Sequence, residues 1–264
     1  MAWEDGQSVP PLATERDGRM TETEWLAATN PEAIIFAFTR SKVARRVASV
    51  RKLRLFACSC CRRIWKRLKD QRSQKAVVAA EQYADGQITL DDLSQVEIEA
   101  AAAERLAIRE TGRGGWRTKA AEAAKIVVRQ RVDGCQPNRP STLLDLARLA
   151  SFVANGVRDV EHLRPGASFD DRSAQLALLR DIFCNPFQPV TVDPASLGAS
   201  VVALARAADL ERLLPSGKLD PDRLAVLAEA LEERDAPGAM VEHLQSKKAH
   251  VRGCWAVDLC LGLT

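Results

Sequence analysis

The chain has 264 residues, of which 46% are hydrophobic, 28% charged and only 5% aromatic, with a net charge of +3. This composition is that of a globular protein and excludes an intrinsically disordered one, and the length suffices for a sizeable core without disulfide staples. No apolar run of about 18 residues occurs, which excludes a membrane-spanning helix, and an odd number of cysteines, seven, argues against a secreted disulfide framework.

Residues 1–19 are predicted to form a disordered leader. They contain Pro10, Pro11 and several acids, and they lack the apolar run of a signal peptide, so we expect a cytoplasmic protein. Helical signals begin at Thr21 or Thr23, and Asn30 precedes a second helix whose first position holds a proline, where proline is tolerated. A strongly helical pattern then covers residues 42–70, with one apolar stripe formed by Leu53, Phe56, Cys60, Ile64 and Leu68.

Further helices are expected over residues 71–83, 90–110 and 116–132, where runs of alanine favour the helical state. The segment 133–140 contains a glycine and two prolines and is the clearest breaker in the chain. We therefore place a boundary there, between an N-terminal helical part, residues 20–132, and a C-terminal helical part, residues 141–264. The two parts are expected to form one compact unit.

The C-terminal part predicts helices over residues 141–163, 170–183, 195–213, 221–233 and 239–261. Asp220 is the expected N-cap of the fourth, and the last is expected to break near Ser246. Residues 185–194 hold three prolines and predict an extended crossing with at most one short strand. The fold class is therefore all-α, a compact multi-helix array of roughly ten to twelve helices with short connections.

The basic residues are concentrated in one segment. Residues 40–75 hold fourteen lysines and arginines against a single acid, Asp70, for a net charge of +13. Such a block is typical of a surface that neutralises phosphates, which suggests a nucleic-acid-associated protein, although no base-reading motif accompanies it. The alternative is a solvated helix face whose charges pair with acids elsewhere. The candidate nucleic-acid-binding residues are Arg45, Arg46, Arg62, Arg63, Lys66 and Arg67.

Cysteine and histidine spacing raises a metal hypothesis. Cys58 and Cys61 form a C-x-x-C pair, and His250 and Cys254 stand four apart, as on one helix face. Together they would complete a tetrahedral zinc site if the fold brought them together. However, C-x-x-C pairs that bind zinc usually lie on a turn, and this one lies in a predicted helix, so buried core cysteines are the simpler interpretation. A third interpretation is that Cys58 and Cys61 form a redox pair whose thiolates the neighbouring arginines stabilise, although the sequence predicts no βαβ unit of the thioredoxin type.

Catalytic signatures are absent from the sequence. It has three histidines, His162, His243 and His250, and no G-x-S-x-G, P-loop or H-E-x-x-H motif. The sequence therefore favours a protein that is not an enzyme. We expect a helical binding or scaffold module that acts on a protein partner, with a nucleic-acid-associated protein and a zinc-stabilised helical domain as the alternatives.

Six segments of the sequence are distinctive: residues 20–26, 51–65, 80–86, 178–187, 224–233 and 250–262. Together they resemble an uncharacterised family of alanine-rich proteins that is expanded in large-genome planctomycetes. The resemblance implies no activity. It implies a usual start at Met20 and a variable region over residues 97–140. The helix that contains Cys58 and Cys61 and the segment of His250 and Cys254 both belong to the shared segments. The resemblance therefore suggests that they are in contact, in a common core or a metal site.

Overall fold

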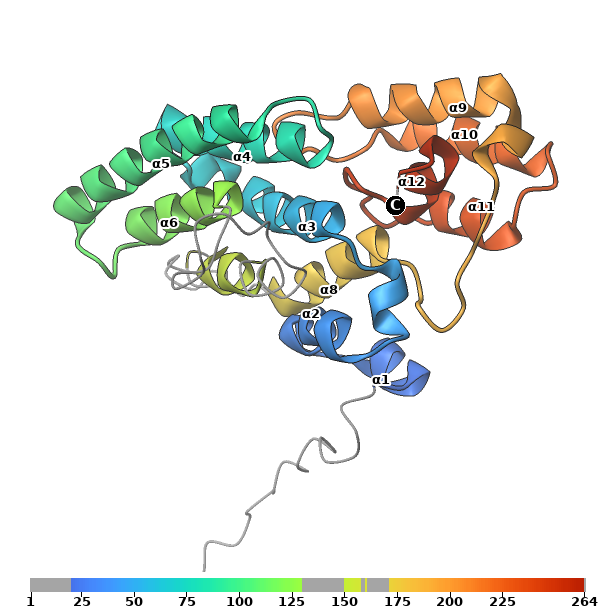
Figure 1. Ribbon diagram of the computed structural model, residues 1–264, viewed down its shortest axis with the longest axis horizontal. Coiled ribbons are helices and arrows are strands. Elements are labelled where there is room, and N and C mark those ends of the chain that lie inside the picture. The colour runs from blue at the N-terminus through green and yellow to red at the C-terminus, as the bar shows by residue number, and fades with distance from the viewer. Residues whose placement is uncertain (1–19, 130–149, 158–159, 161–170, 264) are drawn as a thin grey trace, which may run out of the picture.

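The computed structural model describes residues 20–129, 150–157, 160 and 171–263, and this part of the chain is built of helices (Figure 1). The helices are α1 (Glu22–Ala27), α2 (Pro31–Arg40), α3 (Val50–Arg63), α4 (Gln71–Ala84), α5 (Leu90–Thr111), α6 (Trp116–Val128), α8 (Asp171–Ile182), α9 (Pro194–Leu210), α10 (Pro221–Glu232), α11 (Gly238–Leu244) and α12 (Trp255–Leu261), with short 3-10 helices η1 (Ala44–Val47) and η2 (Trp65–Arg67). Residues 150–157 are helical as well. The predicted all-α class is confirmed.

Two predicted features lie outside the described residues, namely the leader, residues 1–19, and the boundary at residues 133–140. Within the described ranges the extended crossing forms no strand, and only isolated bridges join Lys218 to Leu213 and to Val251. None of the described helices is both long and apolar enough to span a bilayer.

Caps in the sequence determine where several helices begin. Asp220 accepts a hydrogen bond from the first turn of α10, as predicted, and Asn30, which was predicted only to precede a helix, caps α2 in the same way. The helix predicted over residues 42–70, in contrast, is interrupted. Ala48 and Ser49 are extended, and the Ser49 hydroxyl accepts the amide hydrogen of Lys52 at 3.2 Å, so α3 begins only at Val50. The cap thus overrides the periodicity that predicted a single helix.

The larger core surrounds α3, which contacts α4, α6 and α8 and lies in the middle of the molecule (Figure 1). The apolar stripe predicted for this helix, Leu53 to Leu68, is almost completely buried. Aromatic side chains from distant segments complete the core, since the rings of Phe38 and Phe183 lie 4.4 Å apart and Trp25 packs on Phe38. We call this group, which runs from Trp25 to Phe183 and includes Val251, the N-terminal core.

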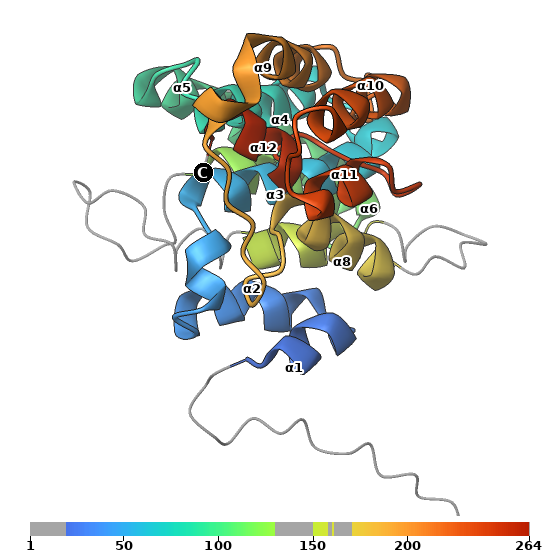
Figure 2. The same ribbon diagram turned by 90° about the vertical axis from the view of Figure 1, so that its right-hand side faces the viewer.

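A smaller core lies between α9, α10, α11 and α12, with α9 and α10 on the far side of α12 from α1 and α2 (Figure 2). It consists mainly of leucine, alanine and valine, with Met240, Trp255 and two cysteines, Cys254 and Cys260. We call it the C-terminal core. Because α8 contributes to the N-terminal core, the two cores divide in the sequence between Phe183 and Leu197, with Val251 as the one exception among the described residues.

Buried ion pairs cross the junction of the two cores. Arg51 of α3 pairs with Asp258 of α12 at 2.6 Å, and Arg252, next to α12, pairs with Asp85 at the end of α4. Arg212, which follows α9, reaches Glu81 of α4 at 3.2 Å. Charges buried in this way need partners with good geometry, so these pairs fix how the two cores meet.

A glycine turn brings the loop before α12 against α3. Gly253 has a φ of 86°, a conformation that other residues rarely adopt. A Cβ at this position would also lie 2.9 Å from Cδ1 of Leu55, a buried residue of α3. The turn therefore needs glycine for both its backbone conformation and its close approach to α3.

Candidate metal centre

Four side chains with metal-binding atoms converge where α8 meets α11 and α12. Asp181 comes from the last turn of α8, His243 from α11, His250 from the loop that follows, and Cys254 from the N-cap of α12. Each offers one ligand atom, and all four atoms lie within 4.8 Å of one another. One ligand therefore comes from the helix of the N-terminal core and three from the C-terminal region.

The distances resemble the edges of a coordination tetrahedron. The Nε2 atom of His243 lies 3.1 Å from Oδ1 of Asp181 and 3.3 Å from Sγ of Cys254. The Nδ1 atom of His250 lies 3.8 Å from the same sulfur and 2.6 Å from the same oxygen. Ligands at zinc bond lengths in a tetrahedron are separated by roughly 3.3–3.8 Å. Of these four separations, three agree with this range to about 0.2 Å and the contact of His250 with Asp181 is shorter. The six separations of the set extend to within 4.8 Å, so the ligands would have to move closer together around an ion.

Neighbouring groups hold the ligands in place. The second oxygen of Asp181, Oδ2, accepts the amide hydrogen of Val251 at 2.8 Å. The Nε2 atom of His250 lies 3.3 Å from the hydroxyl of Ser246, and the ring of His243 packs on that of Trp255 at 4.8 Å between centroids. Such outer contacts orient carboxylate and imidazole ligands around metals.

The cluster is almost completely buried. Cys254 is inaccessible, Asp181 and His250 are 4% exposed, and His243 is half-buried. Burial raises the pKa of the Cys254 thiol, and the nearby charge of Asp181 raises it further. Burial alone would also raise the pKa of Asp181, but hydrogen bonds from His243 and His250 lower it below its ordinary value. The carboxylate is thus ionised, ready to bind a cation.

This arrangement can coordinate a metal ion more readily than it can perform covalent catalysis. Cysteine, histidine and aspartate also form nucleophile–base pairs, but a nucleophile must be accessible and ionised. Cys254 has neither property, because it is buried and its pKa is raised. A cation that displaced the thiol proton would instead find four ligands from the protein and a closed shell.

The structure brings together two of the four metal ligands predicted from the sequence, His250 and Cys254. They do not share a helix face, since α11 ends at Leu244, α12 begins at Trp255, and the break predicted near Ser246 is confirmed. Cys58 and Cys61 are fully buried in α3 as part of the N-terminal core. Across the described ranges neither belongs to a group of three or more metal-binding side chains.

Sequence reasoning missed Asp181 and gave His243 no metal role. Asp181 carries a signal, because it is an acid among residues of an apolar helix face: Leu178, Leu179, Ile182 and Phe183. A buried acid in such a face needs a partner, although the sequence does not indicate which residue supplies it.

The predicted nucleic-acid-binding residues have different environments. Arg62 is buried and donates two hydrogen bonds to Glu81, at 2.5 and 2.7 Å. Arg63 is half-buried, and the Arg67 guanidinium lies over the ring of Trp116. Only Arg45, Arg46 and Lys66 are exposed.

Two further arginines of the basic segment form ion pairs or hydrogen bonds within the protein. Arg51 pairs with Asp85 and Asp258, and Arg54 donates to the carbonyl of Val127 at 2.6 Å. Arg51 and Arg62 thus pair with acids elsewhere, as one part of the alternative interpretation predicted, but Arg54 and Arg62 are buried, whereas that interpretation predicted a solvated helix face.

Comparison with known proteins identifies no relative, since no family profile, curated protein or solved structure matches the chain. The resemblance to the planctomycete family stays a prediction.

Proposed function

We propose that this protein is a non-enzymatic, zinc-stabilised helical module, in which Asp181, His243, His250 and Cys254 bind one Zn²⁺ ion. The observation that supports the proposal is the convergence of four ligand atoms of different chemistry within 4.8 Å, in a buried place and with outer contacts that orient them. Surface charge clusters lack this combination of burial and orientation.

Zinc fits this set of ligands best. A thiolate and two imidazoles are typical zinc ligands, and a carboxylate completes a four-coordinate shell, whereas calcium and magnesium prefer oxygen ligands alone. Four protein ligands leave no open position for water or substrate, which is the mark of a structural and not a catalytic site. A closed shell leaves the ion no catalytic role, and the function we infer for the module is the one expected from the sequence, to present a helical surface to a protein partner.

The ion would join two parts of the fold. Asp181 lies in α8, and the residues next to it in the sequence, Leu179, Ile182 and Phe183, are fully buried in the N-terminal core. The other three ligands belong to the segment of α11, α12 and the loop between them. Because a metal site of this kind exists only in the folded chain, its binding energy contributes directly to folding.

Elemental analysis of the purified protein tests the proposal. We expect about one zinc ion per chain, and its loss in the variants Asp181→Asn, His243→Asn and Cys254→Ser, each checked for helix content by circular dichroism. Cys58→Ala and Cys61→Ala are matched controls, since both cysteines are buried yet lie outside the cluster. Zinc that is retained in Asp181→Asn and lost in Cys58→Ala would refute the proposed ligands and favour the set predicted from the sequence. Absence of bound metal after reconstitution with zinc would refute the site itself.

A further inference from the structure

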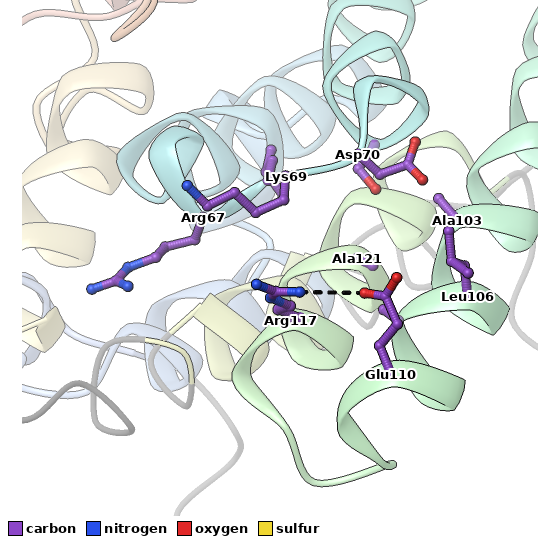
Figure 3. Close-up of a pocket in the computed structure, with 11 residues that line it drawn as sticks. Arg67, Lys69, Asp70, Ala103, Leu106, Glu110, Arg117 and Ala121 are labelled. Atoms are coloured by element: carbon purple, nitrogen blue, oxygen red, sulfur yellow. Dashed lines mark hydrogen bonds and ion pairs between the residues drawn. The ribbon is translucent and has the colours of Figure 1, made fainter.

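A cavity of about 280 Å³ lies where the start of α4 meets α5 and α6, away from the metal cluster (Figure 3). Leu68, Ala103, Ala107 and Ala121 line it and are all buried, so that its inner wall is mainly apolar. Alanine allows the helices to pack closely but does not fill the place where α4 begins. The inner wall therefore suits an apolar group.

The cavity is open to solvent. Leu106, which also lines it, is 37% exposed, and the lining residues Glu110 and Arg117 are exposed as well. Figure 3 shows these two charged side chains pointing toward one another, and they form an ion pair at 3.3 Å. An apolar group can thus enter from outside without separating a buried ion pair.

Two cations lie beside the cavity and not within it. In Figure 3 the charged ends of Arg67 and Lys69 extend away from the alanine wall. Neither cation forms an ion pair with an acid in the part of the chain that the structure describes, and the Arg67 guanidinium lies 5.2 Å from the ring centroid of Trp116. A ligand small enough to fit inside the cavity does not reach these cations. A ligand that uses both the cavity and the cations is therefore a longer chain.

The surface around the cavity carries a positive net charge. Residues 65–70, before α4, hold three cations and one acid, and residues 109–117, between α5 and α6, also hold three cations and one acid. Both acids are already paired, because Asp70 lies 2.6 Å from Arg72 and Glu110 pairs with Arg117. The charge of this surface thus complements an acidic partner.

We propose that this cavity is the docking site for an acidic segment of a partner protein. The segment inserts one bulky apolar side chain into the cavity and places carboxylates on Arg67 and Lys69. Protein interfaces often combine an apolar anchor in a pocket with a polar rim, and carboxylates form strong hydrogen bonds with arginine and lysine. This inference rests on the part of the proposed function that concerns a protein partner, and it does not depend on the zinc ion.

Fluorescence anisotropy tests the site with a labelled probe peptide, Glu-Glu-Gly-Trp-Gly-Glu-Glu, and the full chain reconstituted with zinc. We expect binding that weakens as the salt concentration rises, because salt screens the charges of the exposed rim. The peptide with alanine in place of tryptophan should bind at least about tenfold more weakly, since it lacks the anchor. The peptide with lysine in place of glutamate should not bind. These comparisons use the unaltered protein and do not depend on the folding of a variant.

Variants of the protein locate the binding site. Ala107→Leu, which places a larger side chain in the cavity wall, should abolish binding of the tryptophan peptide, and Lys69→Glu should weaken it several-fold. Arg206→Glu is the matched control, because it makes the same change of charge at an exposed residue of α9 that does not line the cavity. It should bind the peptide as the parent does. Helix content and the unfolding temperature show whether each variant is folded.

Several results would overturn the docking site: no binding of the tryptophan peptide, equal binding of the tryptophan and alanine peptides, or equal losses in Lys69→Glu and Arg206→Glu. Displacement of the peptide by a lower concentration of oligothymidylate than of unlabelled peptide would also overturn it, because the cations would then serve a nucleic acid. Elemental analysis of the same samples keeps the two proposals separate. A zinc-loaded chain that binds no peptide refutes only the docking site, and a chain that binds the peptide but no zinc refutes only the metal site.

Discussion

The N-terminal core and the C-terminal core are stabilised by different interactions. The N-terminal core buries large aromatic and aliphatic side chains around α3, among them Trp25, Phe38, Phe56 and Phe183. The C-terminal core is smaller and depends mainly on leucine, valine and alanine, with Trp255 as its one aromatic side chain among the described residues. Since stabilisation by burial grows with the apolar area removed from water, the first core can rely on burial more than the second.

Polar groups gather where the second core meets the first. The candidate metal ligands lie at one side of this junction, and the ion pairs of Glu81, Asp85 and Asp258 cross it elsewhere. Small units often need a metal or another cross-link, because their cores supply little free energy. The comparison therefore predicts that polar interactions determine the stability of the C-terminal core and matter less for the N-terminal one.

Removal of the metal should have the largest effect. If the zinc-loaded protein is treated with a chelator, hydrogen exchange of the α11 and α12 amides should accelerate strongly, because the ligands of both segments lose their ion. Exchange in α3 and α4 should change little. In Asp181→Asn the same chelator should have no further effect. Uniform acceleration through both cores would show that they do not differ in this way.

The substitution Glu81→Gln should have the next largest effect. Glu81 is 2% exposed and accepts hydrogen bonds from Arg62 and Arg212. Loss of its charge leaves these buried cations without compensation, and we expect the free energy of unfolding in urea to fall by about 3–5 kcal/mol. Glu211→Gln is a matched control, since the pair of Glu211 with Arg223 is exposed and should contribute at most about 1 kcal/mol. Similar losses in both variants would remove the distinction.

The contribution of the Glu81 carboxylate should also appear in the pH dependence of stability. Burial would raise the pKa of Glu81, but hydrogen bonds and charge from Arg62, with Arg212 and Arg252 beside it, lower it overall. A carboxylate whose pKa is lowered by folding stabilises the native state fully above its unfolded pKa, about 4.3, and loses that contribution as the pH falls through the folded value. Urea unfolding should therefore show a loss of stability below about pH 4 that is smaller in Glu81→Gln. Parallel pH profiles for the two proteins would contradict this.

The smallest effect is expected for the exposed basic residues of the N-terminal region. Arg45, Arg46 and Lys66 changed together to glutamate should alter the unfolding temperature little, since surface charges contribute little to stability. Retention of this variant on heparin and DNA columns at increasing salt tests the nucleic-acid hypothesis. A large loss of retention relative to the parent protein would support that hypothesis, and unchanged retention would contradict it.

Much of the fold could be predicted because helix signals are local. The caps Asn30 and Asp220, the stripe from Leu53 to Leu68 and the break near Ser246 were all visible in the sequence. The candidate site was only half visible, because two of its four ligands, Asp181 and His243, lie about 60 residues apart in the sequence and meet only through the packing of α8. Spacing rules detect ligands that are neighbours in sequence, such as His250 and Cys254, and cannot detect partners that tertiary contacts supply.

Substitution with cobalt tests the central claim most directly, because Co²⁺ occupies zinc sites and its visible spectrum reports both geometry and ligands. The account predicts intense d–d bands of a tetrahedral ion and a thiolate-to-cobalt charge-transfer band in the near ultraviolet. The charge-transfer band should disappear in Cys254→Ser and persist in Cys58→Ala. Weak bands of octahedral cobalt, or a charge-transfer band that is unchanged in Cys254→Ser, would contradict it.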